Sequence, residues 1–389
     1  MPNLESQLAR WQSAGVIDSE VAARIRAYEA AEQKPAGLRW QGLVALILGA
    51  ILLATGVVLF VSAHWDDIGP FPRFCLVIAM VSVFHLGGSL SRANFRHLST
   101  TLHAVGTVST GAAIALVGQI FNIQEHWPAA ILMWAIAALA GWALLRDEAQ
   151  QILTLLLFPA WILCEWSFYA DRYHGSQVYE ARIIATWAAL YLTFWLGSAR
   201  KAVWGLCFAA GAIAIVVATI VLLDGWDWND LRPQFLPVGL RIWGWIVIAI
   251  LPLLFAALRP RRSLIPVAAA LTASIALPFC RTNVSEDYWN GTNHYTSSHS
   301  VPSLAAHALV AGFAIFLAWW GVRQASKALV NYGIVAFAGA VIWFFFADLF
   351  SKMGRSLGLI GLGVLFLAGG WALEKTRRRL IAHMQEARA

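Results

Sequence analysis

Long apolar stretches, each about as long as a bilayer is thick, fill the chain from Gly42 almost to its end. A helix needs about 20 apolar residues to cross a hydrocarbon core, and only helices and closed barrels satisfy their backbone hydrogen bonds there. The first stretch, from Gly42 to Ala63, contains no charged residue. The chain is therefore predicted to be all-α, a polytopic transmembrane helical bundle of about 12 spans.

Charged residues make up 13% of this 389-residue chain, and hydrophobic residues make up 59%. Soluble domains carry about a quarter charged residues, so most of this surface is expected to face lipid. Membrane lipid is therefore the first expected partner. The spans are predicted at residues 42–63, 73–90, 98–120, 128–145, 150–170, 182–198, 202–223, 238–258, 262–279, 302–322, 329–350 and 356–373.

Residues 1–40 precede the first span and differ from it in pattern. Apolar residues recur at helical spacing on either side of Gly15, first at Leu4, Leu8 and Trp11 and then at Val21, Ile25 and Tyr28. This pattern predicts a cytoplasmic helix-turn-helix-like pair. Because so few residues cannot build an independent core, we expect the pair to pack on the membrane domain or to bind a protein partner. No nucleic acid is expected, since basic and acidic residues alternate in this segment.

Most of the 28 lysines and arginines fall on one side of the predicted topology. They lie in residues 1–40, in alternate connections between spans, and in the C-terminal segment. Because positive residues mark the cytoplasmic side, we expect an even number of spans with both termini cytoplasmic. The predicted domains are the N-terminal pair (1–40), the transmembrane bundle (41–375) and a basic cytoplasmic tail (376–389).

A short Trp-centred pattern follows the first and the seventh predicted span. Residues 65–70 are WDDIGP and residues 228–233 are WNDLRP, both on the predicted outer side. Two parallel six-helix halves, 41–200 and 201–375, would produce such a repeat, although chance or a shared interfacial turn explains six positions equally well. The candidate outer-face motif consists of His64, Trp65, Asp66, Asp67, Trp228 and Asp230.

Five polar residues inside or at the ends of predicted spans form a candidate polar path: Gln119, Glu165, His85, His103 and His307. An ionisable residue is costly in hydrocarbon and usually faces a bundle interior or a cavity. His85 and His103 share the inner half of the membrane, where they could relay protons or bind a metal if their rings converge. Neutral histidines bonded to helix carbonyls are the alternative. Glu165 is the best candidate for a protonatable coupling site, or else a carboxylate that reaches the outer boundary.

The longest predicted outer loop, residues 281–301, carries Glu286, Asp287, His294 and His299. Histidine and carboxylate groups suit acid–base chemistry. The loop is rich in Ser, Thr and Asn, however, which favours a mobile connector. No phosphate loop, HExxH or GxSxG pattern occurs in the chain. We therefore predict no catalytic residue, no metal site and no cofactor, and an enzyme is not the favoured interpretation.

The sequence resembles an uncharacterised bacterial membrane family, domain of unknown function 2157. The resemblance is carried by three N-terminal patterns and one C-terminal pattern, namely Leu8, Trp11, Gly15 and Ile17; Ala63, His64, Trp65 and Ile68; Gly118, Gln119, Ile120 and Phe121; and Ser356, Gly361, Gly369, Gly370, Leu373 and Glu374. It implies a multi-pass protein of the bacterial inner (plasma) membrane. It implies no activity, because none is agreed for the family.

Three functions remain open. The favoured one is a transporter-like or small-solute-handling bundle, in which Gln119, Glu165 and the Trp65–Asp67 turn line a polar path. The first alternative is a non-catalytic envelope scaffold or assembly partner that binds proteins through residues 1–40 or the outer loops. The second is an envelope glycan- or lipid-modifying membrane enzyme that uses the loop with His294. A membrane-spanning polar cavity would favour the transporter-like bundle. A solid core with an exposed loop groove would favour the scaffold, and a cleft beside His294 would favour the enzyme.

Overall fold

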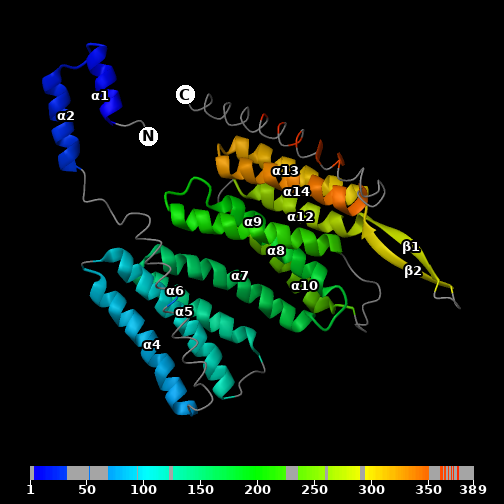
Figure 1. Cartoon of the computed structure of the whole chain (residues 1–389). Helices are drawn as coiled ribbons and strands as arrows, with labels where there is room; N and C mark the ends of the chain where they lie inside the picture. The colour runs from blue at the N-terminus through cyan, green and yellow to red at the C-terminus, as the bar shows by residue number, and fades with distance from the viewer. Residues whose placement is uncertain are drawn as a thin grey trace. The chain divides into compact units, whose positions relative to one another are not determined.

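The computed structural model describes residues 4–32, 52, 69–93, 95–121, 126–224, 235–258, 262–289 and 294–349, and eight separate positions between 360 and 375. The described chain is mostly helical (Figure 1). It divides into two compact units, Met1–Arg73 and Phe74–Ala389, and each is considered by itself. The candidate outer-face motif lies outside the described residues, as do most positions of the predicted spans 42–63 and 356–373.

In the first unit, helices α1 (Leu4–Ser13) and α2 (Ser19–Glu32) lie where the sequence predicts two short helices. Gly15 has a φ of +68°, a conformation that favours glycine, and makes the turn between them. The Asp18 side chain accepts a hydrogen bond from the Val21 backbone N–H at 2.7 Å and so caps α2. That this pair is cytoplasmic stays a prediction.

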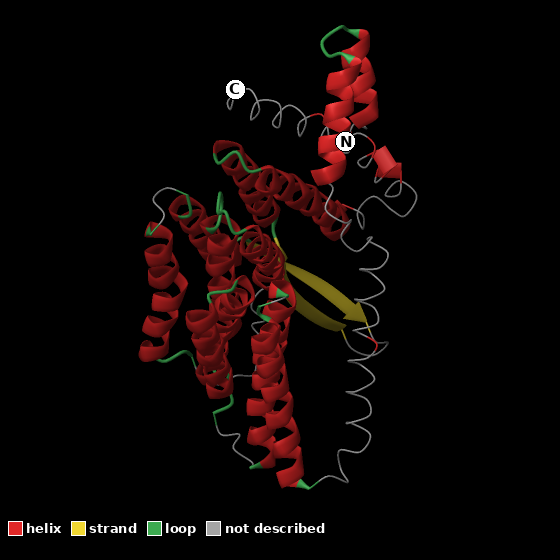
Figure 2. Cartoon of the chain, turned by 90° about the vertical axis from the view of Figure 1, so that its left-hand side faces the viewer, coloured by secondary structure: helices red, strands yellow, loops and turns green. Residues whose placement is uncertain are grey.

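The second unit is a bundle of helices (Figure 2). Its helices are α4 (Pro70–Ser91), α5 (Arg96–Ile120), α6 (Pro128–Leu145), α7 (Glu148–Ala170), α8 (Ser176–Phe194), α9 (Lys201–Asp224), α10 (Val238–Trp245), α11 (Leu251–Ala257), α12 (Leu264–Ala276), α13 (Leu304–Arg323) and α14 (Lys327–Phe344). Short π- or 3₁₀-helical segments extend or join some of them: η1 (Ile246–Ile250), η2 (Leu277–Phe279) and η3 (Phe345–Leu349).

Eight described helices are long and apolar enough to cross a membrane. They are α4, most of α5, α6, α7, most of α9, the continuous α10–η1–α11 helix, α13 and α14 with part of η3. Their surfaces are largely apolar and exposed, as on Val83, Leu86 and Leu90 of α4, which is expected where lipid is the solvent. The protein is thus an integral membrane protein with several apolar helices. The full count of about 12 spans stays a prediction.

Two predicted spans differ from the structure. The span predicted at 182–198 is α8, which begins six residues earlier, after Gly175 at a φ of +78°. Arg182 is therefore inside the helix and not at its outer end, where the predicted boundary at residue 182 put it. The span predicted at 262–279 is α12 and η2, a shorter apolar helix of residues Leu264–Phe279.

A large buried cluster of the bundle is built from α8, α9, α11, α12, α13 and α14. Glycines let pairs of these helices approach closely. A Cβ at Gly333 of α14 would lie 2.5 Å from the Ala318 backbone nitrogen of α13. A Cβ at Gly211 of α9 would lie 2.7 Å from the Ala188 carbonyl oxygen of α8. Small residues permit such approaches, which membrane helices use because lipid provides no hydrophobic drive between them.

The predicted connector at 281–301 is wrong in structure, and so is the all-α class at this place. Strands β1 (Arg281–Trp289) and β2 (His294–Pro302), yellow in Figure 2, form an antiparallel hairpin that leaves one end of the bundle (Figure 1). Arg281 fixes its base, because Nη1 donates to the Leu223 carbonyl at 2.6 Å and Nε donates to Ser300 Oγ at 2.7 Å. The Leu223 carbonyl lies at the C-terminal end of α9, where a cation is favourable.

Candidate functional site

The structure brings His85 of α4 and His103 of α5 together. Their Nδ1 atoms are 3.1 Å apart, a hydrogen-bond distance. The His103 ring lies against Gly88, three residues after His85, and the His85 ring lies against Gly106, three residues after His103. A Cβ at Gly88 would be 2.9 Å from the His103 ring, and one at Gly106 would be 2.8 Å from the His85 ring. The glycines thus make room for the rings, and the two histidines join the two helices.

A buried polar network extends from this pair to α6 and α7. Gln150 is fully buried, and its Nε2 donates to the His103 carbonyl at 3.0 Å and lies 2.8 Å from Thr107 Oγ1. The Trp134 indole donates to the Thr107 carbonyl at 2.8 Å. Gly141 leaves space for the Gln150 amide, since a Cβ there would be 2.8 Å from its oxygen. The Gln150 amide, the Thr107 hydroxyl and the Trp134 indole each have a partner, which is how buried polar groups become tolerable.

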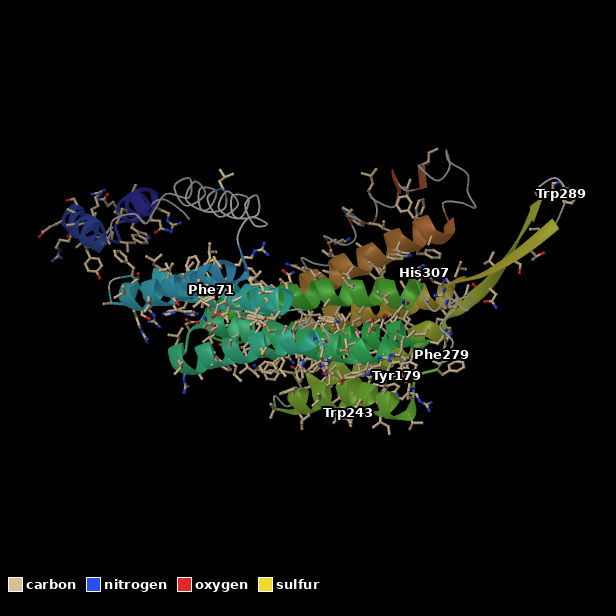
Figure 3. The ribbon with its side chains drawn as sticks, turned by 90° about the horizontal axis from the view of Figure 1, so that it is seen from below. Phe71, Tyr179, Trp243, Phe279, Trp289 and His307 are labelled. Carbon is tan, nitrogen blue, oxygen red and sulfur yellow. The ribbon has the colours of Figure 1, made fainter. Side chains whose placement is uncertain are left out.

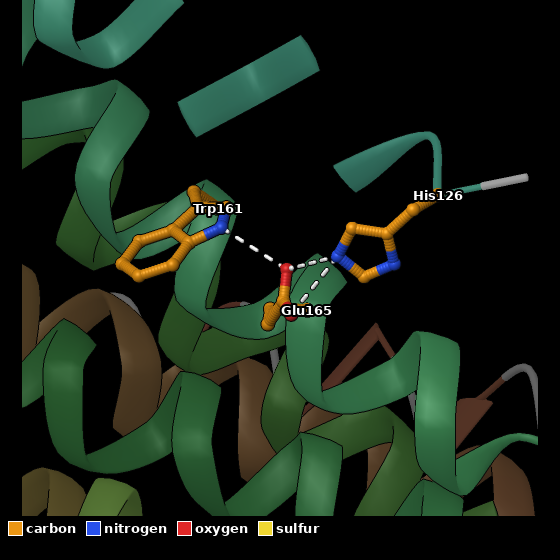
Figure 4. A network of polar contacts seen from close by, with 3 residues as sticks. All are labelled: His126, Trp161 and Glu165. Carbon is orange, nitrogen blue, oxygen red and sulfur yellow. Dashed lines mark hydrogen bonds and ion pairs between the residues drawn. The ribbon is translucent and has the colours of Figure 1, made fainter. Parts of the chain in front are cut away.

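Glu165 of α7 belongs to a second polar group (Figure 4). The His126 Nε2 lies 3.1 Å from both carboxylate oxygens, and the Trp161 indole donates to Oε2 at 3.2 Å. His126 also packs edge-on against Phe168, with ring centroids 4.7 Å apart. The His126 and Glu165 side chains are 36% and 30% exposed. His126 was not predicted as a site residue. It lies just before α6, and the short connection between α6 and α7 brings the start of α6 beside the end of α7.

The other predicted residues lie apart from these two groups. Gln119 is exposed near the end of α5. His307 is buried near the start of α13, where its Nδ1 lies 3.0 Å from the Ser303 carbonyl oxygen and its ring packs against Phe344. A continuous polar path through all five residues therefore stays a prediction. Within the described residues, no three His, Cys, Asp or Glu side chains gather as metal ligands.

An apolar cavity of about 310 Å³ lies between α9, α13 and α14. Among the described residues of its lining, the ionisable side chains are His307 and Tyr332. The Tyr332 hydroxyl donates to the Ala212 carbonyl at 3.0 Å. Val335, in the same lining, is 69% exposed, so the cavity opens on the face expected to meet lipid. Figure 3 shows His307 at the end of the bundle from which the hairpin leaves.

A second apolar cavity, of about 420 Å³, lies between α7, α8 and α9. Pro159 in its lining has no N–H, so the Leu155 carbonyl one turn earlier loses its helical donor. The Tyr191 hydroxyl donates to that carbonyl instead. One turn earlier on α8, the Trp187 indole donates to the Val247 carbonyl at 3.1 Å. These two aromatic residues therefore supply hydrogen bonds to backbone carbonyls of neighbouring helices beside this cavity.

Arg182 is a functional candidate that the sequence did not single out. It is 9% exposed on α8, and its Nε donates to the Ser274 carbonyl of α12 at 3.3 Å. Its guanidinium carbon lies 5.7 Å from the ring centroids of both Tyr179 and Trp245. Cation–π contacts contribute about 0.5–2 kcal/mol each. The effective cost of burying an ion is several kcal/mol, so the rings offset only part of it.

Comparison with known proteins gives one family. No curated protein and no solved structure matches the chain. Residues 9–151 match the family described as "Predicted membrane protein (DUF2157)", which confirms the resemblance predicted from the sequence. From α1 into the first turn of α7, and hence through His85, His103 and Gln119, this chain is similar to that family of membrane proteins.

Proposed function

We propose that this protein is a membrane-embedded binding protein for an amphipathic lipid-like molecule. The observation that carries the proposal is the apolar cavity between α9, α13 and α14, with buried His307 in its lining. Ligand pockets are mostly apolar, with a few polar groups that fix orientation. An apolar tail fits such a lining, and an imidazole at one end suits a polar head group.

The dimensions of the cavity support a chain-like ligand. Its lining on α13 extends from His307 to Leu317, which is about 15 Å along a helix. Thr219 contributes the one hydroxyl from α9, and it donates to the Ile215 carbonyl of its own helix at 2.7 Å. A polar solute would therefore leave most of its polar groups without partners in this space, which is costly.

The proposal keeps the predicted topology and revises the favoured activity. It includes about 12 spans, both termini in the cytoplasm and the bacterial inner membrane, supported by the distribution of Lys and Arg and by the family resemblance. Transporter-like handling of a polar solute receives less support. Neither Gln119 nor Glu165 lines the cavity of about 310 Å³ or that of about 420 Å³.

Filling the cavity tests the proposal. Gly339 of α14 lines it, and a Cβ there would meet no atom within 4 Å, so Gly339→Leu should occupy the space without disturbing the helices. We expect a lipid with a photoreactive tail to label α9 and α14 in the wild-type protein and to lose most of that labelling in the variant.

Gly312→Leu is the matched control. It lies on α13, also has no atom within 4 Å of an added Cβ, and is outside the lining of this cavity. It should label as the wild type does. Equal labelling of Gly339→Leu and wild type, or labelling spread evenly over all helices, would show that the cavity holds no lipid.

A second candidate function, the envelope assembly partner, is favoured by the hairpin. Trp289, at the end of β1, is 69% exposed, and Figure 3 shows it far from the bundle. Two-stranded ribbons are marginally stable alone, and their unpaired edges readily accept another strand. Replacing residues 282–300 with a short Gly-Ser loop should abolish a partner interaction while leaving lipid labelling intact. Retained co-purification of partners after this replacement would remove the hairpin from consideration.

A further inference from the structure

Arg182 is a buried cation that has no counter-ion among the described residues. It lies six residues into α8, about 9 Å from the start of the helix, and it is 9% exposed. Within the described part of the chain, its side chain makes one hydrogen bond and no ion pair. Glu180 is two positions away, and residues at that spacing do not face each other on a helix. A charged group in such a place usually marks a functional site.

The surroundings leave one edge of the guanidinium available. The side chain has five N–H donors in a fixed fork, and the Ser274 carbonyl accepts only from Nε. Neither Nη group belongs to the fully enclosed polar atoms that lack a partner, so both keep some accessible surface. The Nη1–Nη2 edge therefore presents two parallel donors, the arrangement that binds a carboxylate or phosphate in a bidentate manner.

Aromatic rings hold this edge in place without neutralising it. Tyr179 and Trp245 each lie 5.7 Å from the guanidinium carbon, and Trp166 stacks on Tyr179 at 5.5 Å with an interplanar angle of 13°. Gly244 permits the stack, because a Cβ there would be 2.7 Å from the Tyr179 ring. The site is thus a rigid aromatic cradle around a positive charge.

We propose that Arg182 binds one oxyanion, a carboxylate or a phosphate, which supplies the missing counter-charge. Tyr179 lies toward the end of the bundle that carries the hairpin, so the anion enters from that side (Figure 3). The source is either the head group of an anionic lipid or a free anion, since both offer the same oxygen pair. This site goes beyond the proposed function, because Arg182 does not line the cavity that contains His307.

The test uses full-length protein in nanodiscs. Thermal unfolding is followed in phosphatidylcholine discs with added phosphate or acetate at constant ionic strength, and in discs that contain phosphatidylglycerol. Stabilisation by phosphatidylglycerol assigns the lipid head group, and stabilisation by the added salts assigns a free anion. Arg182→Gln should lose either effect, with anion affinity lowered by about tenfold or more.

Arg323→Gln is the matched control, because Arg323 also lies over a tryptophan, Trp319, at 4.4 Å but is exposed. It should respond as the wild type does. Arg182→Lys keeps the positive charge but lacks the paired N–H donors of the guanidinium. If Arg182→Gln does not fold, weakened anion binding by Arg182→Lys supports the proposal. Unchanged binding in either Arg182 variant, or no anion effect in the wild type, overturns it.

Discussion

At the scale of single residues, side chains of α8 bond to backbone carbonyls of other helices that lose their helical donors. The Leu155 carbonyl faces Pro159, and Tyr191 bonds to it. The Leu251 N–H bonds to the Ile246 carbonyl in the π-helical turn, and Pro252 has no N–H, so Val247 has no donor from its own helix. The Trp187 indole fills that role.

This arrangement predicts a coupling between Tyr191 and Pro159. Tyr191→Phe should lower the free energy of unfolding by about 1–3 kcal/mol, because the Leu155 carbonyl is left unpaired. In a Pro159→Ala background the loss should be much smaller, since residue 159 then provides an N–H. Unfolding in detergent of the wild type, both single variants and the double variant measures the coupling.

Tyr332→Phe provides the control. The Tyr332 hydroxyl also bonds to a helix carbonyl, that of Ala212, but residue 216 is Val, whose N–H remains available to it. Its loss should be small and independent of Pro159. An equal loss from Tyr191→Phe in both backgrounds would refute the explanation.

The histidine pair predicts a specific distribution of protons. One Nδ1 must donate and the other must accept when both rings are neutral. His103 Nε2 is enclosed and has no partner in the described part of the chain, and a buried N–H without an acceptor is rarer than an unused acceptor. We therefore expect His103 to carry its proton on Nδ1 and His85 on Nε2. Nitrogen-15 chemical shifts of the two imidazole rings check these tautomers, and the His85→Gln variant assigns the signals. A proton on Nε2 of both rings would contradict the prediction.

At the scale of whole elements, the α13–α14 pair depends on one close approach. Gly333→Ala should lower the free energy of unfolding by about 1–3 kcal/mol, because the new Cβ meets the α13 backbone, which cannot move aside. Gly339→Ala, on the same helix in open space, should be neutral or slightly stabilising. Thermal unfolding of both variants in the same detergent makes the comparison. Similar behaviour of the two would mean that the helices are less tightly packed at Gly333 than described.

Element types were largely predictable from hydropathy, but element details depended on contacts. Apolar length alone placed α4 to α7. His85 and His103 lie at similar sequence distances from the turn between α4 and α5, so the sequence predicts a similar level for both. The contact of the two rings did not follow, because it depends on Gly88 and Gly106 of the facing helices. The span predicted at 182–198 put Arg182 at its outer end. Its burial did not follow from the sequence, because the rings that hold it come from both α8 and α10.

The hairpin was missed although the sequence carries its signal. Asn290–Gly291 lies between two segments with Tyr and Trp, and such a pair is the strongest short-range sign of a hairpin. The Ser and Thr content instead suggested a connector. The register, with Trp289 opposite His294, places residues 290–293 between the strands.

At the scale of the whole molecule, the arrangement of Lys and Arg makes a prediction about sidedness. Only α13 separates the hairpin from the connection between Arg323 and Lys327, so these two places must lie on opposite faces if α13 spans the membrane. The positive connection should be cytoplasmic. Residues of α1 should share that side, because the sequence predicts an even number of crossings between α1 and Lys327.

Single cysteines at Ser13, Thr296 and Lys327, in a variant without the four native cysteines, test all three statements with an impermeant maleimide. In intact cells stripped of their outer envelope, only Thr296→Cys should react; the other two should react after permeabilisation. Labelling of Lys327→Cys without labelling of Thr296→Cys would show that the bundle has the opposite orientation. Labelling of both Thr296→Cys and Lys327→Cys would show that α13 does not cross the membrane. Labelling of Ser13→Cys with Thr296→Cys would make the number of crossings between α1 and Lys327 odd. An odd number would refute the predicted even count. It would also put the positive residues of α1 and of the Arg323–Lys327 connection on opposite sides of the membrane.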